Sequence, residues 1–357
     1  MPLFLDTGRA VADLHGANCV TIGLVNNMPD AAFEATERQF FDLVRDAAAD
    51  HIVLLKLFAI SEVPRGPEMY GSLAGKYRDI AELWDTPLDG LIVTGTEPQA
   101  KNLKDEPYWQ SLSMIVDWAR DHTASAIWSC LAAHAAVLHS DGIEREPLPQ
   151  KQFGVFGCRI AANHPMTQHF PEPLWVPHSR HNSLAEDALI GAGYKILTHS
   201  PDAGVDAFAK QDGSFFLYFQ GHPEYDADTL FREYRRDVTR FLNRERDVYP
   251  GLPQNYFDEI ATAHAESFEE RARADRHSAL MADFPNAALA AGLKNLWRPA
   301  ALGTYEKWIA FLSARKAERR SAIPSIKPVR LRRTWRDWPL PLREPAGGSA
   351  QSGGSAQ

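Results

Sequence analysis

Two short stretches of the sequence carry side chains suited to nucleophilic catalysis. Cys130 follows the apolar run ASAIWS (124–129), and GHPEYD (221–226) places His222 two residues before Glu224. A cysteine thiolate is a strong nucleophile, and a histidine beside it can move protons when a carboxylate orients its ring. Because a lone cysteine is usually a buried structural residue, the histidine–carboxylate pair is what makes this pattern a candidate triad.

The elements around Cys130 alternate between strands and helices over residues 19–240, which predicts an open α/β sheet with helices on both faces. Strands are predicted for 19–25, 51–60, 88–95 and 124–129, and helices for 31–48, 107–122 and 131–139. Cys130 then lies between a strand and a helix, at the sheet edge where ligand sites form and where the helix dipole favours a thiolate.

The second stretch follows a region with stronger β character. GVFGCRI, PLWVPHS and AGYKILTHS are predicted strands, and VDAFAKQDGSFFLYFQG is a predicted hairpin that turns at Asp212–Gly213. His222 comes directly after this hairpin, so we expect it at a strand end as well. A helix is predicted from about residue 227 to 244, with Asp226 as its N-cap.

The pattern changes after Tyr249, where three helices are predicted over 256–275, 283–293 and 301–317. We therefore expect an α/β domain over 1–250 and a mostly helical extension over 251–317 that packs on it. Residues 318–357 are rich in basic side chains and end in Gly/Ser repeats, which predicts an irregular, flexible tail.

Composition narrows the functional class. The 357 residues are 45% hydrophobic, which is ordinary for a globular protein. The net charge of −8 makes the chain a poor candidate for binding nucleic acid, which needs a dense basic surface. The three cysteines, Cys19, Cys130 and Cys158, include no CxxC pair, so no metal site is expected and a reducing cytoplasm is the expected location. No secretory signal and no apolar run of about 18 residues is present, so no membrane span is expected.

Several ordered segments resemble the homoserine O-succinyltransferase/O-acetyltransferase family of the class I glutamine amidotransferase-like superfamily. They are GLVNNMP (23–29), DGLIVTG (89–95), Tyr108-Trp109, VPHSR (176–180), GHPEYDADTL (221–230) and PQNYF (253–257). The resemblance covers about 19–257 and resumes near 298–312. Most of 258–297 and everything after 317 lies outside it, so the C-terminal extension reads as atypical.

The resemblance implies a flavodoxin-like sheet and specific roles for Cys130, His222 and Glu224. Cys130 would carry an acyl group as a thioester, His222 would be the general base, and Glu224 would be its partner. The backbone N–H of Leu131 is a candidate oxyanion donor. Three further side chains are implied to bind the amino-acid substrate: Lys151, Ser179 and Arg236.

The implied activity is transfer of an acetyl or succinyl group from acyl-CoA to the hydroxyl of L-homoserine, as in methionine biosynthesis. No cofactor is expected beyond the acyl-CoA co-substrate, and a homodimer is one candidate assembly. Gln99 occupies the implied acyl-specificity position, where the family has glycine for succinyl and glutamate for acetyl. Glutamine fills space as glutamate does but lacks its repelling charge, so the sequence leaves both donors open.

Three alternatives remain open from the sequence. The extra C-terminal region would allow serine or another hydroxy-amino acid as acceptor. A glutamine amidotransferase-type hydrolase would use the same triad, but the usual G-x-C-x-G turn is replaced by Trp128-Ser129-Cys130-Leu131-Ala132. A catalytically inactive binding module would not need the complete Cys130, His222 and Glu224 set.

Overall fold

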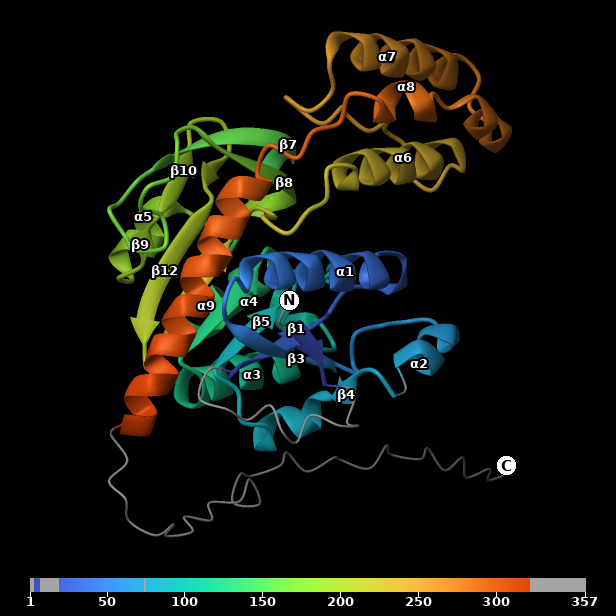
Figure 1. The fold of residues 1–357 in the computed structure, drawn as a ribbon. Coiled ribbons are helices and arrows are strands. Elements are labelled where there is room, and N and C mark those ends of the chain that lie inside the picture. The colour runs from blue at the N-terminus through green and yellow to red at the C-terminus, as the bar shows by residue number, and fades with distance from the viewer. Residues whose placement is uncertain (1–2, 7–18, 74, 322–357) are drawn as a thin grey trace, which may run out of the picture. The chain divides into compact units, whose positions relative to one another are not determined.

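A mostly parallel sheet forms the centre of the computed structural model, which describes residues 3–6, 19–73 and 75–321 (Figure 1). In that part of the chain the sheet has nine strands, in the order β1-β3-β2-β5-β6-β13-β12-β9 with β4 beside β3. The strands are β1 (Leu3–Leu5), β2 (Cys19–Val25), β3 (Ile52–Ala59), β4 (Arg78–Asp79), β5 (Gly90–Val93), β6 (Ser125–Ser129), β9 (Lys195–Ile196), β12 (Ala207–Asp212) and β13 (Ser214–Phe219). The strands from β1 to β13 pair in parallel, and only β12 and β9 run antiparallel to their neighbours.

Helices cover both faces of this sheet, so the predicted open α/β architecture is confirmed. They are α1 (Asp30–Ala47), α3 (Trp109–His122), α4 (Leu131–Asp141) and α9 (Arg298–Ser321). Side chains alternate along each strand, and Val93 and Trp128 enter the core that α3 and α4 cover. Their neighbours Ile92 and Ile127 enter the core that α1 and α9 cover. Both faces are therefore apolar, as buried parallel strands require.

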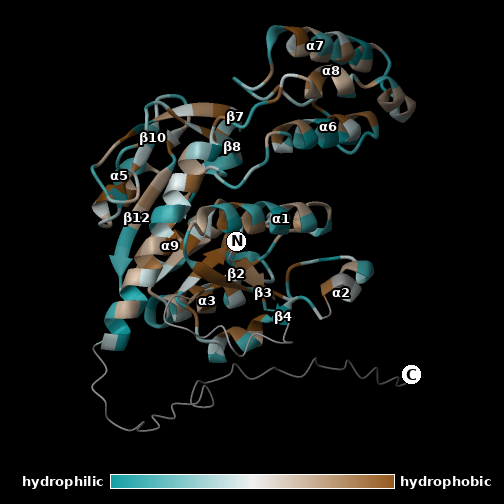
Figure 2. Ribbon diagram, viewed as in Figure 1, coloured by the Kyte–Doolittle hydropathy of each residue, from teal (hydrophilic) through white to brown (hydrophobic). Residues whose placement is uncertain are grey.

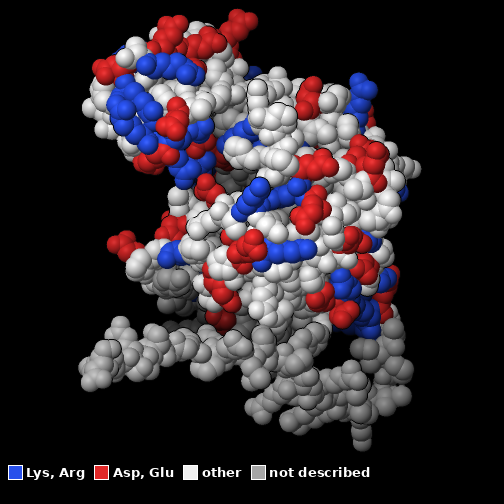
Figure 3. All heavy atoms as spheres, turned by 180° about the vertical axis from the view of Figure 1, so that it is seen from behind, with Lys and Arg blue, Asp and Glu red and all other residues white. Residues whose placement is uncertain are grey.

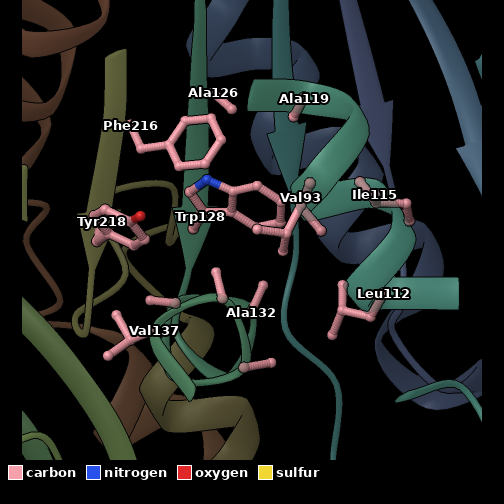
Figure 4. Packing of buried hydrophobic residues seen from close by; sticks show 14 of the residues in the cluster. Val93, Leu112, Ile115, Ala119, Ala126, Trp128, Ala132, Val137, Phe216 and Tyr218 are labelled. Atoms are coloured by element: carbon pink, nitrogen blue, oxygen red, sulfur yellow. The ribbon is translucent and has the colours of Figure 1, made fainter. Parts of the chain in front are cut away.

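The core under α3 and α4 supports the strand that leads to Cys130. Trp128 of β6 is fully buried, and Figure 4 shows its indole between Val93, Ile115 and Phe216. Ala132 of α4 lies below the same ring (Figure 4), where its small side chain lets the helix approach the sheet closely. The position of the turn after β6 is therefore fixed by close packing on several sides.

The β-rich region forms a second, antiparallel sheet in the order β11-β10-β7-β8. Its strands are β7 (Glu146–Ile160), β8 (Leu174–Ser183), β10 (Thr198–Ser200) and β11 (Gly204–Val205), and α5 (Glu186–Gly191) follows β8. The hairpin β12–β13 turns at Gly213, as predicted. The run AGYKILTHS differs from the single strand expected, because β9 pairs with β12 and β10 pairs with β7. Leu197 is fully buried at the change from one sheet to the other.

A group of helices follows the hairpin: α6 (Thr229–Leu242), α7 (Glu259–Ala274) and α8 (Asn286–Ala290). Tyr234 of α6, Phe268 of α7 and Leu289 of α8 share one apolar cluster with Phe153 of β7. The predicted cap of α6 is wrong: Asp228 holds the N-cap position, and Asp226 instead forms an ion pair with Arg38 at 2.9 Å. The short helix α2 (Pro67–Leu73) was not predicted, because its Gly- and Pro-containing sequence has no apolar period.

The last helix, α9, is longer than the predicted 301–317 and belongs to the main core. The indole Nε1 of Trp308 donates to Ser125 Oγ at 2.8 Å beneath the sheet. Lys316 Nζ donates to Asp89 Oδ2 and to the Cys19 carbonyl, both at 2.6 Å. Because α9 reaches Ser321, it includes the first four residues of the predicted 318–357 tail, and the rest of that tail lies outside the described residues.

The surface of the described residues carries polar side chains and charges of both signs. Figure 2 shows the central strands as hydrophobic and the outer helices as mixed, and on the face drawn in Figure 3 acidic and basic side chains alternate without a continuous basic area. Within residues 3–6, 19–73 and 75–321, no helix is long and apolar enough to cross a bilayer. The same residues contain no group of three side chains arranged to hold a metal ion.

Candidate active site

Cys130 occupies the sharp turn between β6 and α4. Its backbone has φ 51° and ψ −112°, a conformation that residues other than glycine rarely adopt. Its N–H donates to the Phe219 carbonyl at 2.7 Å. This geometry projects the Cys130 side chain from a strand-to-helix turn, as a nucleophile requires, and it costs about 1–3 kcal/mol of backbone strain. The thiol is partly exposed, whereas Cys19 and Cys158 are buried in β2 and β7, as expected for structural residues.

His222 and Glu224 lie at the same edge, because β13 is the parallel neighbour of β6 and ends opposite it. His222 Nδ1 is 2.8 Å from Glu224 Oε1, and the ring is within hydrogen-bonding reach of the Cys130 thiol. Burial alone would lower the pKa of His222, but the negative charges of Cys130 and Glu224 outweigh it and raise that pKa well above its ordinary value. The structure thus brings the three expected side chains together, and it favours the protonated form of the His222 ring.

The backbone of the His222 loop is held from behind by a buried carboxylate. Asp206 Oδ1 accepts the Gly221 N–H at 3.2 Å, and Asp206 Oδ2 accepts the Thr198 hydroxyl at 2.8 Å. Burial raises the pKa of Asp206 to about 6, although these donors oppose it. A Cβ on residue 221 would lie 2.6 Å from Asp206 Oδ1 and 2.5 Å from Val176 Cγ1, so only glycine fits there. Close contacts therefore hold the backbone just before His222.

The expected oxyanion donor, the Leu131 N–H, opens the helix α4. The first N–H groups of a helix have no acceptor within it, and none is recorded for Leu131 in the described part of the chain. Gly95, just after β5, lies beside this donor, since a Cβ there would be 3.0 Å from Leu131 N and 3.3 Å from the Ser129 carbonyl oxygen. The absent side chain leaves room next to the N–H for a substrate oxygen.

The three residues expected to bind an amino acid meet around two carboxylates of α6. Lys151 Nζ is 3.3 Å from Glu233 Oε2 and 3.5 Å from Asp237 Oδ2. The Ser179 hydroxyl donates to Glu233 Oε2, and Arg236 Nε donates to Asp237 Oδ1 at 3.0 Å. Burial would raise the pKa of Glu233, but Lys151 and the hydroxyl donors lower it overall, so this carboxylate is ionised. Both signs of charge are therefore present in one small cluster.

Tyr225 connects this cluster to His222. Its ring stacks on that of His222 with centroids 4.2 Å apart, and its hydroxyl donates to Glu233 Oε1 at 2.7 Å. Tyr225 therefore contacts both the imidazole and the cluster on α6. Sequence reasoning missed Tyr225 and Glu233, although Glu233 precedes Arg236 by three residues on the predicted helix and so shares its face.

Gln99 lies in the segment between β5 and α3, and its side chain is exposed. Glu106 holds the backbone of this segment, because its Oε1 accepts the N–H groups of Gln99 and Ala100, both at 2.6 Å. Glu106 is itself buried. The structure thus fixes the main chain at Gln99 while it leaves the Gln99 side chain in solvent.

Comparison with known proteins places this geometry in a family. Residues 5–319 match the family model described as homoserine O-succinyltransferase. A homoserine O-succinyltransferase of Rhodopseudomonas palustris is 49% identical over 298 residues, which cover 84% of this chain and 90% of that protein. One from Methylorubrum extorquens is 47% identical over 296 residues, which cover 83% of this chain and 88% of that protein.

Among solved structures, a glutamine amidotransferase from Methylobacillus flagellatus is similar at a TM-score of 0.48 and 16% identity, over 82% of this chain and 95% of that one. The match over 5–319 also corrects the view that most of 258–297 lies outside the resemblance, because α7 and α8 fall within it. The segment was missed because its helices carry no chemically distinctive residues. The chain belongs to the homoserine O-succinyltransferase family.

Proposed function

We propose that this protein transfers a succinyl group from succinyl-CoA to the hydroxyl of L-homoserine through a thioester on Cys130, as a step of methionine biosynthesis. The observation that carries the proposal is the contact of His222 with both Cys130 and Glu224 at the turn that opens α4. The similar proteins are named homoserine O-succinyltransferases, which favours succinyl over acetyl as the transferred group.

In the first half-reaction, the Cys130 thiolate attacks the thioester carbonyl of succinyl-CoA. The Leu131 N–H, whose place at the helix start leaves it without an acceptor, donates to the developing oxyanion. When the tetrahedral species collapses, the bond to the CoA sulfur breaks and the imidazolium of His222 gives its proton to the departing thiolate. The products are free CoA, a succinyl thioester on Cys130 and a neutral imidazole.

Loss of the thiolate prepares His222 for the second half-reaction. The charge on Cys130 is the largest influence that raises the pKa of His222, and it disappears when the sulfur becomes a thioester. The pKa of the ring therefore falls, and the imidazole can take the proton of the homoserine hydroxyl while the oxygen attacks the acyl carbonyl. Cleavage of the thioester restores the thiolate–imidazolium pair, so the enzyme gains and loses no proton over one turnover.

The cluster on α6 supplies complementary charges for the acceptor. We propose that Arg236 and Lys151 bind the homoserine carboxylate and that Glu233 binds its ammonium group. In the free protein these cations and carboxylates pair with one another, with Lys151 Nζ 3.3 Å and Arg236 Nη2 3.9 Å from Glu233 Oε2. Tyr225, which joins Glu233 to His222, would then set the distance between the bound amino acid and the base.

Glu233→Gln is expected to raise the KM for homoserine by about 10²-fold, since a charged hydrogen bond is worth roughly 2–3 kcal/mol. The rate of acylation by succinyl-CoA, measured without acceptor, should stay within about threefold of the parent rate. The matched control is Glu266→Gln, an exposed carboxylate on α7. An unchanged KM in Glu233→Gln would contradict the assignment.

Gly95→Ala is expected to lower kcat by about 10²-fold, because the added methyl group would crowd the Leu131 N–H and the oxyanion beside it. The measurement is a steady-state assay of CoA release. Gly191→Ala is the control, because a Cβ there meets no atom within 4 Å. Parent-like activity in Gly95→Ala would exclude Leu131 N–H as the donor.

The function is tested by a matrix of two donors, succinyl-CoA and acetyl-CoA, against two acceptors, homoserine and serine. Succinyl-CoA with homoserine should release CoA fastest, while acetyl-CoA or serine in the same assay should be slow. A separate assay with glutamine measures ammonia release, which would identify the hydrolase alternative. A protein that released CoA from neither donor, and gained no mass from either, would contradict acyl transfer altogether.

A further inference from the structure

Arg145 lies between α4 and β7, beside the segment that carries Gln99. Its Nη2 donates one long hydrogen bond, of 3.5 Å, to the Lys101 carbonyl oxygen. A guanidinium has five N–H donors, and no other bond from Arg145 is recorded among the residues that the structure describes. Burial lowers the pKa of Arg145, and the neighbouring Tyr108 and Glu106 only partly oppose this effect. The arginine is thus a partly desolvated cation with donors to spare.

No carboxylate among residues 3–6, 19–73 and 75–321 comes within ion-pair distance of Arg145. The charged and titratable groups that interact with it over longer distances are Tyr108, Glu106, Cys130 and Glu144. Glu106 is already engaged, since its Oε1 accepts the backbone N–H groups of Gln99 and Ala100. Because a desolvated charge without a partner costs free energy, this arrangement suits an anion that arrives with the substrate.

The segment that Arg145 contacts begins beside the Cys130 turn. A Cβ on Gly95 would lie 3.0 Å from Leu131 N, and Lys101, whose carbonyl oxygen Arg145 reaches, follows six residues later. The charge of Cys130 also acts on Arg145, and no hydrogen bond between the two side chains is recorded among the described residues. With bonds of about 1.5 Å, an extended succinyl chain on the sulfur carries its free carboxylate about 5 Å away. An acetyl group ends in a methyl and would leave the guanidinium unpaired.

We propose that Arg145 binds the free carboxylate of the succinyl group carried on Cys130 and thereby selects succinyl-CoA over acetyl-CoA. The inference rests on the proposed function, because it assigns the donor specificity of the same site. A donor with a free carboxylate can pair with this partly desolvated cation through a charge-assisted hydrogen bond, whereas an uncharged acyl group cannot. Donor choice in this chain is then set by a residue outside the Gln99 position.

The test compares acylation of the full-length protein by succinyl-CoA and by acetyl-CoA in the parent, Arg145→Gln and Arg145→Lys. For each protein, kcat/KM for CoA release is measured with both donors, and the acyl-enzyme is identified by intact mass. Arg145→Gln should lower kcat/KM for succinyl-CoA by about 10²-fold, the usual loss when one partner of a charge pair is removed. The value for acetyl-CoA should change by less than about threefold, and Arg145→Lys should recover part of the succinyl rate.

The ratio of the two donors separates the possible results, because partial unfolding lowers both rates equally. An equal loss with both donors, which leaves their ratio unchanged in Arg145→Gln, would overturn the inference. A parent protein that gains no mass from either donor would instead contradict the proposed function. Lys104→Gln is the matched control, since it removes an exposed cation from the same segment and should leave the ratio unchanged.

Discussion

Cys130→Ala is expected to abolish the acyl adduct and to lower kcat/KM by about 10⁵-fold or more, because the proposed mechanism carries the acyl chain on this sulfur. Intact mass after incubation with succinyl-CoA should show one succinyl group on the parent and none on the variant. Cys158→Ala is the control, because its thiol is fully buried in β7 and should not react. An adduct that persists in Cys130→Ala would place the nucleophile elsewhere.

The same position stores strain that a second substitution can measure. The φ of 51° at Cys130 is unfavourable for any residue with a Cβ but not for glycine. Cys130→Gly should therefore be more stable than Cys130→Ala by about 1 kcal/mol, provided that the turn keeps its shape. Thermal denaturation of the two inactive variants gives the comparison. Equal stability would mean that the turn relaxes once the thiol is gone.

The sequence was sufficient to predict how the catalytic groups meet. Cys130 and His222 each follow a buried apolar strand, and parallel neighbours end at the same edge of a sheet. That geometric rule needs only the order of the strands, so the convergence could be expected although 92 residues separate the two positions. The resemblance to a known family added the three residues that we expect to bind the amino acid, all of which lie near Glu233.

Residues whose roles depend on long-range contacts were missed. Arg145 and Glu106 read as ordinary charged residues of a connecting segment, since nothing local shows that one is desolvated and the other buried. Leu197 sits within an apolar run that looks like one strand, yet the chain changes sheets there. Which strand an apolar run pairs with depends on the tertiary structure, and a short apolar run does not indicate its partner.

Glu224→Gln is expected to lower kcat by about 10²- to 10⁴-fold, the range seen when the carboxylate behind a catalytic histidine becomes an amide. Glutamine can still contact Nδ1, but it has no charge and can present its N–H₂ group to the ring. The ionised carboxylate is one of the influences that raise the pKa of His222. Without it the imidazolium loses its proton at lower pH.

The pH profile separates this electrostatic role from simple loss of structure. In the proposed mechanism, acylation requires the imidazolium to protonate the departing CoA thiolate, so the rate of the parent should fall as pH rises through the pKa of His222. Glu224→Gln should move this high-pH limb of kcat/KM for succinyl-CoA to lower pH, because removing the anion destabilises the protonated ring. Asp226→Asn removes a carboxylate from the same loop that contacts Arg38 rather than His222, and should leave the limb in place. If Glu224→Gln lost rate at every pH without moving the limb, Glu224 would act by holding the ring in position, and its charge would not govern the protonation of His222.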